Sequence, residues 1–401
     1  MRILSALFVL LGFGISANAF AEDLQTQIDQ IKKQLAAQPS HSDTSVGGYG
    51  EIKFNHFSKE PSRSQLDMSR FVITLGHQFS DQLSFTGEVE WEHAVASKSD
   101  GGETEIEQSY LNYRFSPRLS MKGGLFLIPL GLLNESHEPP VFYGAERNEV
   151  ETRIVPTTWR EGGLSLGGDL DCGLSWQTGV TTGFNLAKFD DASKPLASVH
   201  QELQNAKTQD MSYFAALNYR GLPGLTAGSA LFTGKSTQGN AEFKADPARL
   251  DLGGAGGLIT LYDVHVRWQW KGWDAQAVYA HGSIGDADKI DSKIAAFNLA
   301  HPPADARPFV PSGFFGWYGQ VAYTAWEHGQ MSLSPFARYE EFNTQAKMPT
   351  GFTADSATAD RVWTLGLSFK PHPDVVLKSD YQKFADNKLN DRFNVGLGYM
   401  F

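Results

Sequence analysis

The sequence has almost no cysteine and no long apolar run beyond its first residues. Its 401 residues include one cysteine, Cys172, so an internal disulfide is excluded. After the N-terminal leader no apolar stretch approaches the ~18 residues that a membrane helix needs, which excludes a helical membrane protein. Acidic residues outnumber basic ones by 45 to 34, and the net charge of -11 argues against a nucleic-acid partner.

The first residues form a leader of the secretory type. MRILSALFVLLGFGISANAFAED has one positive charge at Arg2, an apolar run over 3–15, and small residues at Ala19 and Ala21. This pattern predicts a signal peptide over residues 1–21, with a second cleavage option after Ala19. A signal anchor is the alternative, but the apolar run is shorter than the ~20 residues that span a bilayer. The mature chain is therefore expected to be exported, as a soluble protein or as a membrane β-barrel.

A short helical seam follows the leader. Within residues 22–38, Leu24, Ile28, Ile31 and Leu35 are spaced four, three and four apart. They form two heptads of a coiled coil whose core residue types favour a trimer or tetramer over a dimer. Because so short a helix is marginal alone in water, we expect it to assist a homotrimer that other contacts already hold together. The alternative is an amphipathic helix packed on its own chain. The next residues, 39–45, are expected to be a linker.

Residues 46–401 change to a period of two. In LSFTGEVEWEH, from Leu83 to His93, apolar residues take one face of a strand and polar residues take the other. A soluble β-sandwich would show the same alternation. The alternation predicts sixteen strands, at roughly 47–57, 65–79, 83–93, 105–115, 119–129, 160–169, 173–184, 211–221, 224–235, 258–270, 273–282, 313–326, 330–341, 360–370, 375–384 and 391–401.

The lengths of the links between these strands favour a barrel over a sandwich. Short links such as SDQ and PHPD alternate with much longer ones, and the strand count is even. This layout is typical of an all-β, 16-stranded antiparallel transmembrane β-barrel of the Gram-negative outer membrane, with tight periplasmic turns and long external loops. Outer-membrane lipid would surround it, and aromatic residues near the short links would lie at headgroup level. These aromatic residues are Phe79, Phe115, Tyr219, Trp270, Trp273, Trp326 and Phe369.

The C-terminal strand carries two further expectations. Closure of the barrel requires residues 391–401 to pair with the strand that starts near Gly48, because free sheet edges do not occur in lipid. Alternate residues of the C-terminal strand are apolar, and it ends on an aromatic residue. Such a strand resembles the assembly signal of Gram-negative outer-membrane proteins, which implies recognition by the barrel-assembly machinery. The residues of this signal are Phe393, Val395, Leu397, Tyr399 and Phe401.

A barrel of sixteen strands is wide enough to enclose an aqueous pore. The polar faces of the strands carry basic and acidic residues in nearly equal number, so charge counting leaves the sign of the permeant ion open. Inward basic residues could form a ladder for anions. In the alternative, opposite charges pair across the wall. The basic residues expected on the pore wall are Arg70, Arg114, Lys122, Arg220, Arg267, Arg338 and Lys378.

The link between the fifth and sixth strands has a distinctive sequence. Between Gly124 and Gly168 it contains P-x-G, N-x-x-H-E-P, E-R-N-x-V-E and I-x-P-T-T-W in turn. This stretch resembles the corresponding region of the phosphate-selective porin O/P family. The resemblance implies a trimeric diffusion channel for small hydrophilic solutes or ions, whose third long loop, about 129–159, folds inward and narrows the pore. The charged residues expected at this constriction are Glu135, His137, Glu138, Glu146, Arg147, Glu149, Glu151, Arg153 and Arg160.

The spacing of residues in this loop disfavours catalysis and metal binding. His137 and Glu138 lack the HExxH spacing of a zinc helix, and Pro139 and Pro140 forbid a helix there. No G-x-S-x-G elbow occurs in the chain. We therefore expect no catalytic site, no metal and no cofactor. The alternatives to a channel are a non-conducting barrel for envelope anchoring or adhesion and, less favoured, an outer-membrane hydrolase. Five glutamates against two arginines in residues 134–153 leave the permeant open, with anions such as phosphate among the options.

Overall fold

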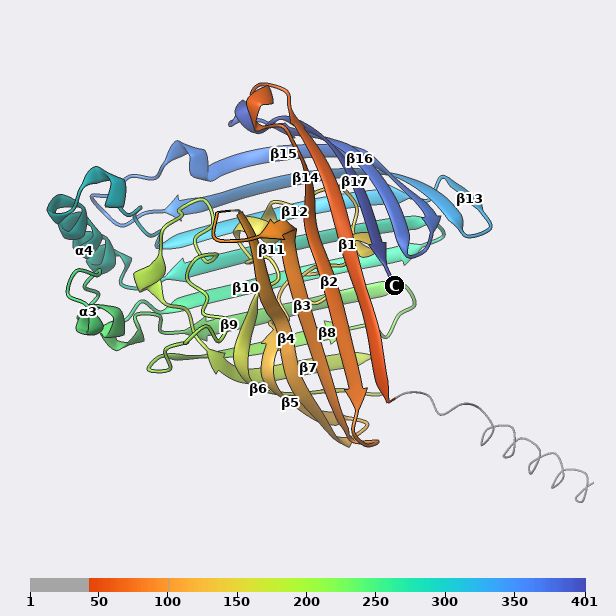
Figure 1. The fold of residues 1–401 in the computed structure, drawn as a ribbon, viewed down its shortest axis with the longest axis horizontal. Helices are drawn as coiled ribbons and strands as arrows, with labels where there is room; N and C mark the ends of the chain where they lie inside the picture. The colour runs from red at the N-terminus through yellow and green to blue at the C-terminus, as the bar shows by residue number, and fades with distance from the viewer. Residues whose placement is uncertain (1–42, 100) are drawn as a thin grey trace, which may run out of the picture. The chain divides into compact units, whose positions relative to one another are not determined.

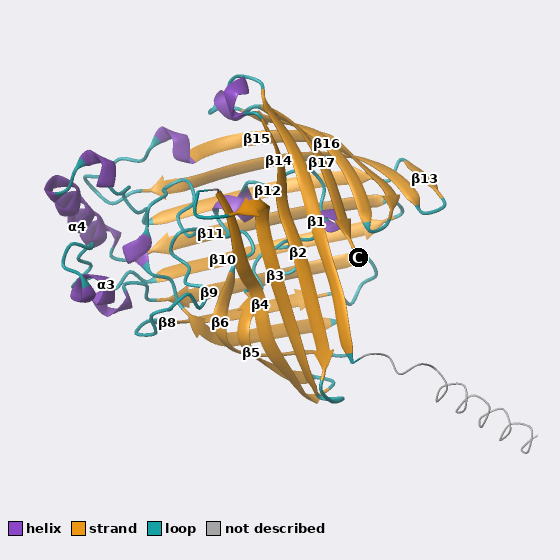
Figure 2. Cartoon of the chain, in the orientation of Figure 1, coloured by secondary structure: helices purple, strands orange, loops and turns teal. Residues whose placement is uncertain are grey.

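The computed structural model describes residues 43–99 and 101–401. Within them Val46–Phe401 form one compact unit, which consists mainly of strands and connecting loops (Figure 2). Several predicted segments lie outside the described residues. They are the signal peptide (1–21), the coiled-coil segment (22–38) with Leu24, Ile28, Ile31 and Leu35, and the linker (39–45) up to residue 42.

The strands follow the period-two segments of the sequence, because alternation of apolar and polar residues suits a sheet with one apolar and one polar face. The strand segments are β1 (Thr44–Phe57), β2 (Gln65–Gln78), β3 (Leu83–Ala96), β4 (Gly101–Ser116), β5 (Leu119–Leu127), β6 (Arg160–Asp169), β7 (Leu174–Thr182), β8 (Met211–Tyr219), β9 (Leu225–Gly234), β10 (Ile259–Trp270), β11 (Trp273–Ile284), β12 (Gly313–Tyr323), β13 (Trp326–His328), β14 (Met331–Lys347), β15 (Ala359–His372), β16 (Val375–Phe384) and β17 (Arg392–Met400).

The sheet closes on itself because β17 pairs antiparallel with β1 (Figure 1). Gly48 and Phe401 exchange two backbone hydrogen bonds at the seam, of 3.0 and 2.9 Å. β12 and β13 both pair with β14 and together make one barrel strand, so the closed barrel has sixteen strands. The predicted fold, a 16-stranded antiparallel barrel, is confirmed.

Short turns join β2 to β3, β4 to β5 and the later pairs in the same manner, whereas most of the alternate links are long. Two links are clearly shorter than predicted. β14 continues to Lys347, past the predicted end at 341, so the link to β15 shrinks from about 342–359 to 348–358. The sequence suggested a loop over about 94–104, but β3 and β4 continue their pairing as far as Ala96 and Gly101, and the link shrinks to 97–100. The strand β1 also begins at Thr44, inside the predicted linker.

The longer links carry the helices. These are α2 (Val150–Arg153), α3 (Ala241–Ala245) and α4 (Ala287–Ala300), together with 3-10 turns at Pro61–Arg63, Pro139–Val141, Leu186–Lys188, Gln238–Asn240, Pro303–Asp305, Ser356–Thr358 and Lys388–Asn390. α3 and α4 lie at one end of the barrel, opposite the end that holds the C-terminus (Figure 1). None of the helices in the described part of the chain has the length and apolar character of a membrane span.

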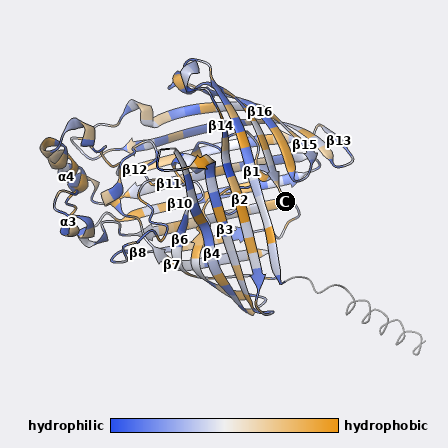
Figure 3. Ribbon diagram, in the orientation of Figure 1, coloured by the Kyte–Doolittle hydropathy of each residue, from blue (hydrophilic) through white to orange (hydrophobic). Residues whose placement is uncertain are grey.

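Burial alternates along the strands and defines an inner and an outer face. On β17, Asn394 is fully buried whereas Phe393 and Val395 are exposed. On β14, Arg338 and Glu340 are buried on the inner face. The outer face is therefore rich in apolar residues while the inner face carries polar and charged ones, an alternation visible along the strands (Figure 3).

A hydrophobic core fills part of the interior at the end of the barrel where the long loops lie. Trp159 stacks on Phe184 with ring centroids 5.0 Å apart, and both contact Phe232 on β9, at 4.5 and 5.2 Å. The core joins residues of 128–159 and 183–210 to inward residues of β8 to β12. The core also includes Phe342 on β14, Val362 on β15 and Phe384 on β16, and so it spans much of this end of the interior.

Candidate functional site: a segment that crosses the barrel interior

The link between β5 and β6, residues 128–159, lies inside the barrel. It makes hydrogen bonds to inward side chains of β1, β12, β14, β16 and β17. In the order of strands around the closed sheet, β14 lies far from β5 and β6 in both directions. We call residues 128–159 the crossing segment, because contacts with β14 require it to traverse the interior.

Asn134 fixes the base of the crossing segment. Its side-chain Nδ2 donates to the carbonyls of Ile128 and Trp159, at 2.7 and 2.8 Å, and its Oδ1 accepts from the backbone N–H of Trp159 at 2.7 Å. Asn134 thus ties the two ends of the segment together with three bonds. Its burial explains why an asparagine, which both donates and accepts, occupies the start of the N-x-x-H-E-P motif.

Glu151 organises the middle of the crossing segment. Its carboxylate accepts from the backbone N–H groups of Leu132 and Leu133, at 2.6 and 2.8 Å, and from Asn148 Nδ2 at 2.9 Å. The hydroxyl of Tyr318 on β12 donates to the same carboxylate at 2.8 Å. Four donors satisfy this buried charge, so Glu151 is an anchor between segment and wall.

A second anchor joins the crossing segment to β14 and β17. Glu149 accepts from Arg153 Nε at 2.7 Å and from Arg392 at 3.0 Å, while its backbone N–H donates to Glu340 on β14 at 2.6 Å. The two guanidinium groups hold the pKa of the Glu149 carboxyl below its ordinary value, although burial alone would raise it. Arg153 also lies over the ring of Phe342, 4.8 Å from its centre. Arg153 is thus held on two sides.

A third anchor joins the segment to β1 and β16. Glu146 accepts from Lys53 Nζ at 3.2 Å and from Asn55 Nδ2 at 2.9 Å, and the N–H of Ala145 donates to Asp380 at 2.6 Å. Burial alone would raise the pKa of Glu146, but Lys53 and Arg392 lower it to about 2. Glu146 is therefore ionised at every physiological pH.

Arg147 differs from its charged neighbours because no carboxylate binds it. Its guanidinium is 9% exposed and makes one hydrogen bond, from Nη1 to Thr158 Oγ1 at 3.0 Å. Among the described residues, its Nε and Nη2 have no hydrogen-bond partner. Burial and the nearby Arg70 lower the pKa of Arg147 to about 10, which still leaves it charged at neutral pH. The charge of this buried guanidinium is therefore not matched by an ion pair, and it adds to the positive potential beside it.

Arg147 lines a basic cavity of about 310 Å³ beside the crossing segment. The cavity lies toward the end of the barrel that holds the long loops, since it is bounded by the last residues of β1 and the first residues of β2 and β17. Its charged lining residues are Lys53, Arg70, Glu146, Arg147, Glu149, Arg153, Lys194 and Arg392. Six cations against two carboxylates give this cavity a positive lining, despite the glutamate excess of the loop sequence.

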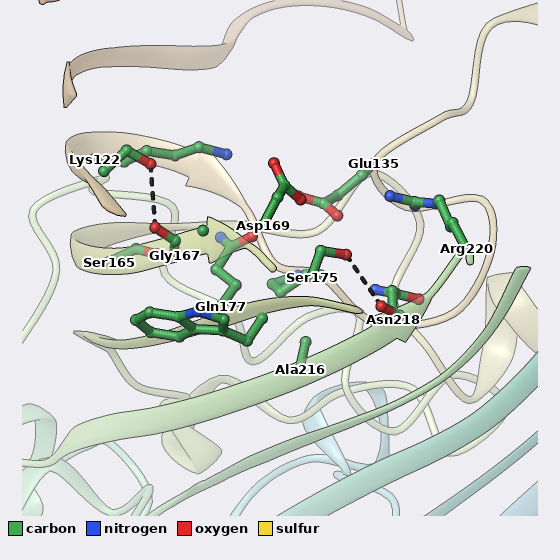
Figure 4. A pocket seen from close by; sticks show the side chains of 14 residues that line it. Lys122, Glu135, Ser165, Gly167, Asp169, Ser175, Gln177, Ala216, Asn218 and Arg220 are labelled. Atoms are coloured by element: carbon green, nitrogen blue, oxygen red, sulfur yellow. Dashed lines mark hydrogen bonds between the residues drawn. The ribbon is translucent and has the colours of Figure 1, made fainter. Parts of the chain in front are cut away.

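A second cavity, of about 210 Å³, lies toward the short turns. Figure 4 shows Lys122 and Arg220 on its wall, with Glu135 of the crossing segment between them. Glu135 is exposed to this space. The crossing segment, which carries the predicted loop residues, therefore lines both cavities.

The remaining residues predicted at the constriction are Arg160, His137 and Glu138, and each has a different environment. Arg160 opens β6 and is buried against Glu105 and Glu202, at 2.5 and 3.2 Å. His137 is buried beside Tyr49, and burial lowers its pKa to about 3, so the imidazole is neutral. Glu138 is partly exposed.

On the predicted pore wall, several basic residues pair with carboxylates. Arg70 contacts Glu51 at 2.9 Å, Arg267 contacts Asp274 at 2.6 Å, and Arg338 contacts Glu340 at 2.7 Å. Lys378 is buried and lies 3.4 Å from the centre of the Phe142 ring. Arg114 lines a further cavity next to the short turns. These pairs match the alternative in which opposite charges neutralise each other across the wall.

A relative in Aquifex aeolicus gives the chain its family. No family model matches the chain. An uncharacterized protein of Aquifex aeolicus is 33% identical over 383 residues, which are 94% of this chain and 82% of that protein. The chain belongs to the family of this Aquifex aeolicus protein. The region shared with this relative spans 94% of the chain.

Solved structures similar to this member of the Aquifex aeolicus family are outer-membrane barrels. OmpF of Salmonella typhi, in a complex with daunomycin, has a TM-score of 0.59 at 13% identity and covers 89% of this chain and 97% of its own. The outer membrane channel DcaP of Acinetobacter baumannii has a TM-score of 0.53 at 13% identity, with coverages of 91% and 99%. The trimer form of OmpT, an outer membrane protein of Vibrio cholerae, has a TM-score of 0.51 at 10% identity, with coverages of 89% and 99%.

These likenesses show the fold, a porin-like outer-membrane barrel. Membership of the phosphate-selective porin O/P family is not confirmed by them.

Sequence reasoning missed one group of inward carboxylates. Glu88 and Glu90 were recognised on the polar face of β3, but Glu107 on β4 was not singled out. The structure buries Glu107 completely, at an irregularity where the partners of Glu88 and Val89 are Gln108 and Ile106. This bulge turns both Glu107 and Gln108 inward. A sequence pattern that could have revealed Glu107 is the run of glutamates at every second position, Glu103, Glu105 and Glu107, because alternate residues of a strand share one face.

Proposed function

We propose that this protein is an outer-membrane diffusion channel that passes small hydrophilic solutes and prefers anions. The observation that carries the proposal is Arg147, a buried guanidinium without a carboxylate partner among the described residues, at the edge of a cavity with six basic groups. Charged groups that line a narrow aqueous passage set the sign of the ions that pass. The solute would move between the two cavities, past the crossing segment.

The outer surface supports placement in the outer membrane. On β10 the exposed residues Tyr262, Val264, Val266, Trp268 and Trp270 follow one another on the outer face. Tyr262 and Trp270 are eight residues apart, which is ~26 Å along a strand at ~3.3 Å per residue. Once strand tilt is included, aromatic residues at both ends of an apolar stretch of this length match the two interfacial girdles of a membrane barrel.

Ion pairing inside the barrel supports a preference for anions. Glu146 accepts hydrogen bonds from Lys53 and Asn55, and Glu149 accepts them from Arg153 and Arg392. The negative charges of both carboxylates are therefore largely neutralised. Arg147 and Lys194 make no ion pair with any described residue. The uncompensated charge that faces the cavity is therefore positive.

The trimer is part of the proposal. The coiled-coil seam of Leu24, Ile28, Ile31 and Leu35 would help three barrels to associate, and the similarity to the trimer form of OmpT is consistent with such an assembly. The C-terminal strand, with Phe401 at the closing seam, would be the segment that the barrel-assembly machinery recognises.

Reversal potentials in a planar bilayer test the proposal. Arg147→Gln removes the unpaired charge, and one unit charge at contact distance is worth about 1 kcal/mol in water. We expect the anion-to-cation permeability ratio to fall about fivefold. Arg153→Gln is the matched control, since Arg153 is neutralised by Glu149, and we expect a smaller change.

Two outcomes would contradict the proposal. A folded, purified protein that gives no conducting steps would favour the non-conducting barrel that serves anchoring or adhesion. Conducting steps with equal permeability ratios in the wild type and Arg147→Gln would retain the channel and reject the role of Arg147 in selectivity.

A further inference from the structure

A cluster of buried acidic groups lies next to the basic cavity, since Arg70, which lines that cavity, is 3.7 Å from Glu90. Glu88 on β3, Glu107 on β4 and His137 of the crossing segment each bring one oxygen or nitrogen atom within 4.8 Å of the other two. A second triplet, Glu90, Glu105 and Glu107, shares Glu107 with the first. Glu88, Glu107 and His137 are all at most 5% exposed. Three chain segments distant in sequence thus present ligand-type atoms to one point.

Among the described residues, arginines pair with the outer glutamates of the cluster, Glu90 and Glu105, but not with Glu88 or Glu107. Arg70 lies at 2.9 Å from Glu51 and at 3.7 Å from Glu90. Arg160 is occupied by Glu105 and Glu202. Within the described part of the chain, neither Glu88 nor Glu107 has an ion pair with an arginine or a lysine. Burial of a carboxylate without a cation costs several kcal/mol, so this arrangement requires either a proton or a bound cation.

Oxygen atoms of the cluster are also left without partners. Glu107 is fully buried, its Oε2 accepts from the Tyr49 hydroxyl at 3.3 Å, and its Oε1 has no hydrogen-bond partner among the described residues. The same holds for Oε1 of Glu90, which is 2% exposed. Unpartnered buried oxygens are rare in folded proteins, because each loses its hydration without replacement. Their positions point to a ligand that supplies positive charge.

The orientation of His137 adds a nitrogen donor. Its Nδ1 lies 3.0 Å from the carbonyl oxygen of Asn134, and since a carbonyl only accepts, Nδ1 carries the proton of the neutral ring. The lone pair of Nε2 then faces the cluster, 3.8 Å from Glu107 Oε2 and 2.8 Å from the Tyr49 hydroxyl. That hydroxyl has a single proton, which goes to Glu107 Oε2, 3.3 Å away, when a metal occupies the lone pair of Nε2. Histidines that bind metals commonly donate their second ring N–H to a carbonyl in this way.

We propose that Glu88, Glu107 and His137 bind one divalent transition-metal cation, with Glu90 as the adjacent carboxylate. Imidazole together with carboxylates suits Zn²⁺ and similar ions, whereas Mg²⁺ and Ca²⁺ prefer oxygen ligands alone. Ligand atoms at about 2.1 Å from a tetrahedral ion lie about 3.4 Å apart, so the separation of His137 from Glu107 needs to shrink by only a few tenths of an ångström.

The bound cation would fasten the crossing segment to β3 and β4. The hydrogen bonds of Glu146, Glu149 and Glu151 hold the segment to β1, β12, β14 and β17, but not to β3 or β4. His137 reaches β4 only through the 3.8 Å contact with Glu107. The metal thus completes the attachment of the segment around the interior. This inference does not depend on whether the barrel conducts.

Metal titration of the folded barrel tests the proposal. The full-length protein, folded and treated with a chelator that is then removed, is titrated with Co²⁺ and followed by visible absorption. Zn²⁺ content is measured after equilibrium dialysis. We expect one ion per chain, Co²⁺ bands that Zn²⁺ displaces, and at least a tenfold loss of affinity in Glu107→Gln and in His137→Gln.

Glu161→Gln is the matched control, because Glu161 is a fully buried glutamate on β6 outside the cluster, bonded to Thr182 and to the N–H of Gln201. It should bind the metal as the wild type does. If His137→Gln fails to give the folded form on unheated gels, Glu88→Gln replaces it. No binding by the wild type at micromolar metal, or equal binding by Glu107→Gln, would overturn the proposal and leave a proton shared between Glu90 and Glu107.

Discussion

Removal of one hydroxyl, in Tyr318→Phe, should loosen the crossing segment by a measurable amount. The Tyr318 hydroxyl donates to Glu151 at 2.8 Å, and both residues are buried. A hydrogen bond to a charged group contributes about 1.5–3 kcal/mol. Three donors to Glu151 remain, from Leu132, Leu133 and Asn148, so we expect the lower part of this range.

Hydrogen exchange followed by mass spectrometry measures this change directly. The amides of Leu132 and Leu133 donate to Glu151 and exchange when the segment opens. A loss of about 1.5–2 kcal/mol corresponds to exchange about 10- to 30-fold faster at these amides, because about 1.4 kcal/mol is tenfold. Peptides from the strands of the barrel should keep their protection, since backbone hydrogen bonds between neighbouring strands hold the sheet and do not involve the Tyr318 hydroxyl.

Tyr339→Phe provides the control, because Tyr339 lies on the opposite face of β14 from Glu340 and contacts Trp317 and Trp363 there. It should leave exchange in 128–159 unchanged. Equal exchange in Tyr318→Phe and in the wild type would refute the view that Glu151 is held to the wall by this bond.

Two further predictions concern the N-terminal segment 23–38 and the helix α4. Deletion of residues 23–38 should lower the yield of trimer on unheated gels while the barrel still shows a heat-dependent shift in migration, and an unchanged trimer yield would show that the seam is dispensable. In α4, burial raises the pKa of Asp291 to about 7, above its usual 3.8. The folded state therefore binds a proton more tightly than the unfolded one, and protection of residues 285–312 from proteolysis should fall as pH rises from about 4 to about 7. Asp291→Asn should abolish this dependence, and a fall that persists in the variant would assign it to another group.

The barrel could be predicted from the sequence because the pattern that marks each strand lies within that strand's own residues. Alternation of apolar and polar residues marks each strand, and the strand bounds agree with the observed ones to within a few residues at most positions. The β3–β4 hairpin was predicted too short because its tip shows no alternation, with Ala94, Val95 and Ala96 in succession on one strand and Gly101 and Gly102 on the other, although the backbone pairing continues.

The pairing of charges could not be predicted, because the partners come from distant strands. Glu151 and Tyr318 are separated by 167 residues, and Glu149 and Arg392 by 243. Alternation places each of these residues on the inner face but does not fix the relative height of strands that are not neighbours. For the same reason the excess of glutamate in the loop gave a misleading picture, since wall cations neutralise Glu146 and Glu149.

The bulge at Glu107 marks another limit. Strict alternation would place Glu107 and Gln108 on opposite faces, whereas the structure turns both inward. A bulge changes the parity of a strand without a composition signal of its own, so alternation alone did not show that Gln108 also turns inward or that His137 meets Glu88 and Glu107.

Some charged residues of the crossing segment are ion-paired with the barrel wall, whereas Arg147 is not. This difference limits which substitutions are tolerated in the segment. A change at Glu146 or Glu149 strands a buried lysine or arginine on the wall, so such positions can vary only together with Lys53 or Arg392. Arg147 has no carboxylate partner to lose. A single substitution there alters the charge presented to a solute without a compensating change elsewhere. Under the proposed channel function, a substitution at this one position would change the charge of the interior while the anchors of the crossing segment stay in place.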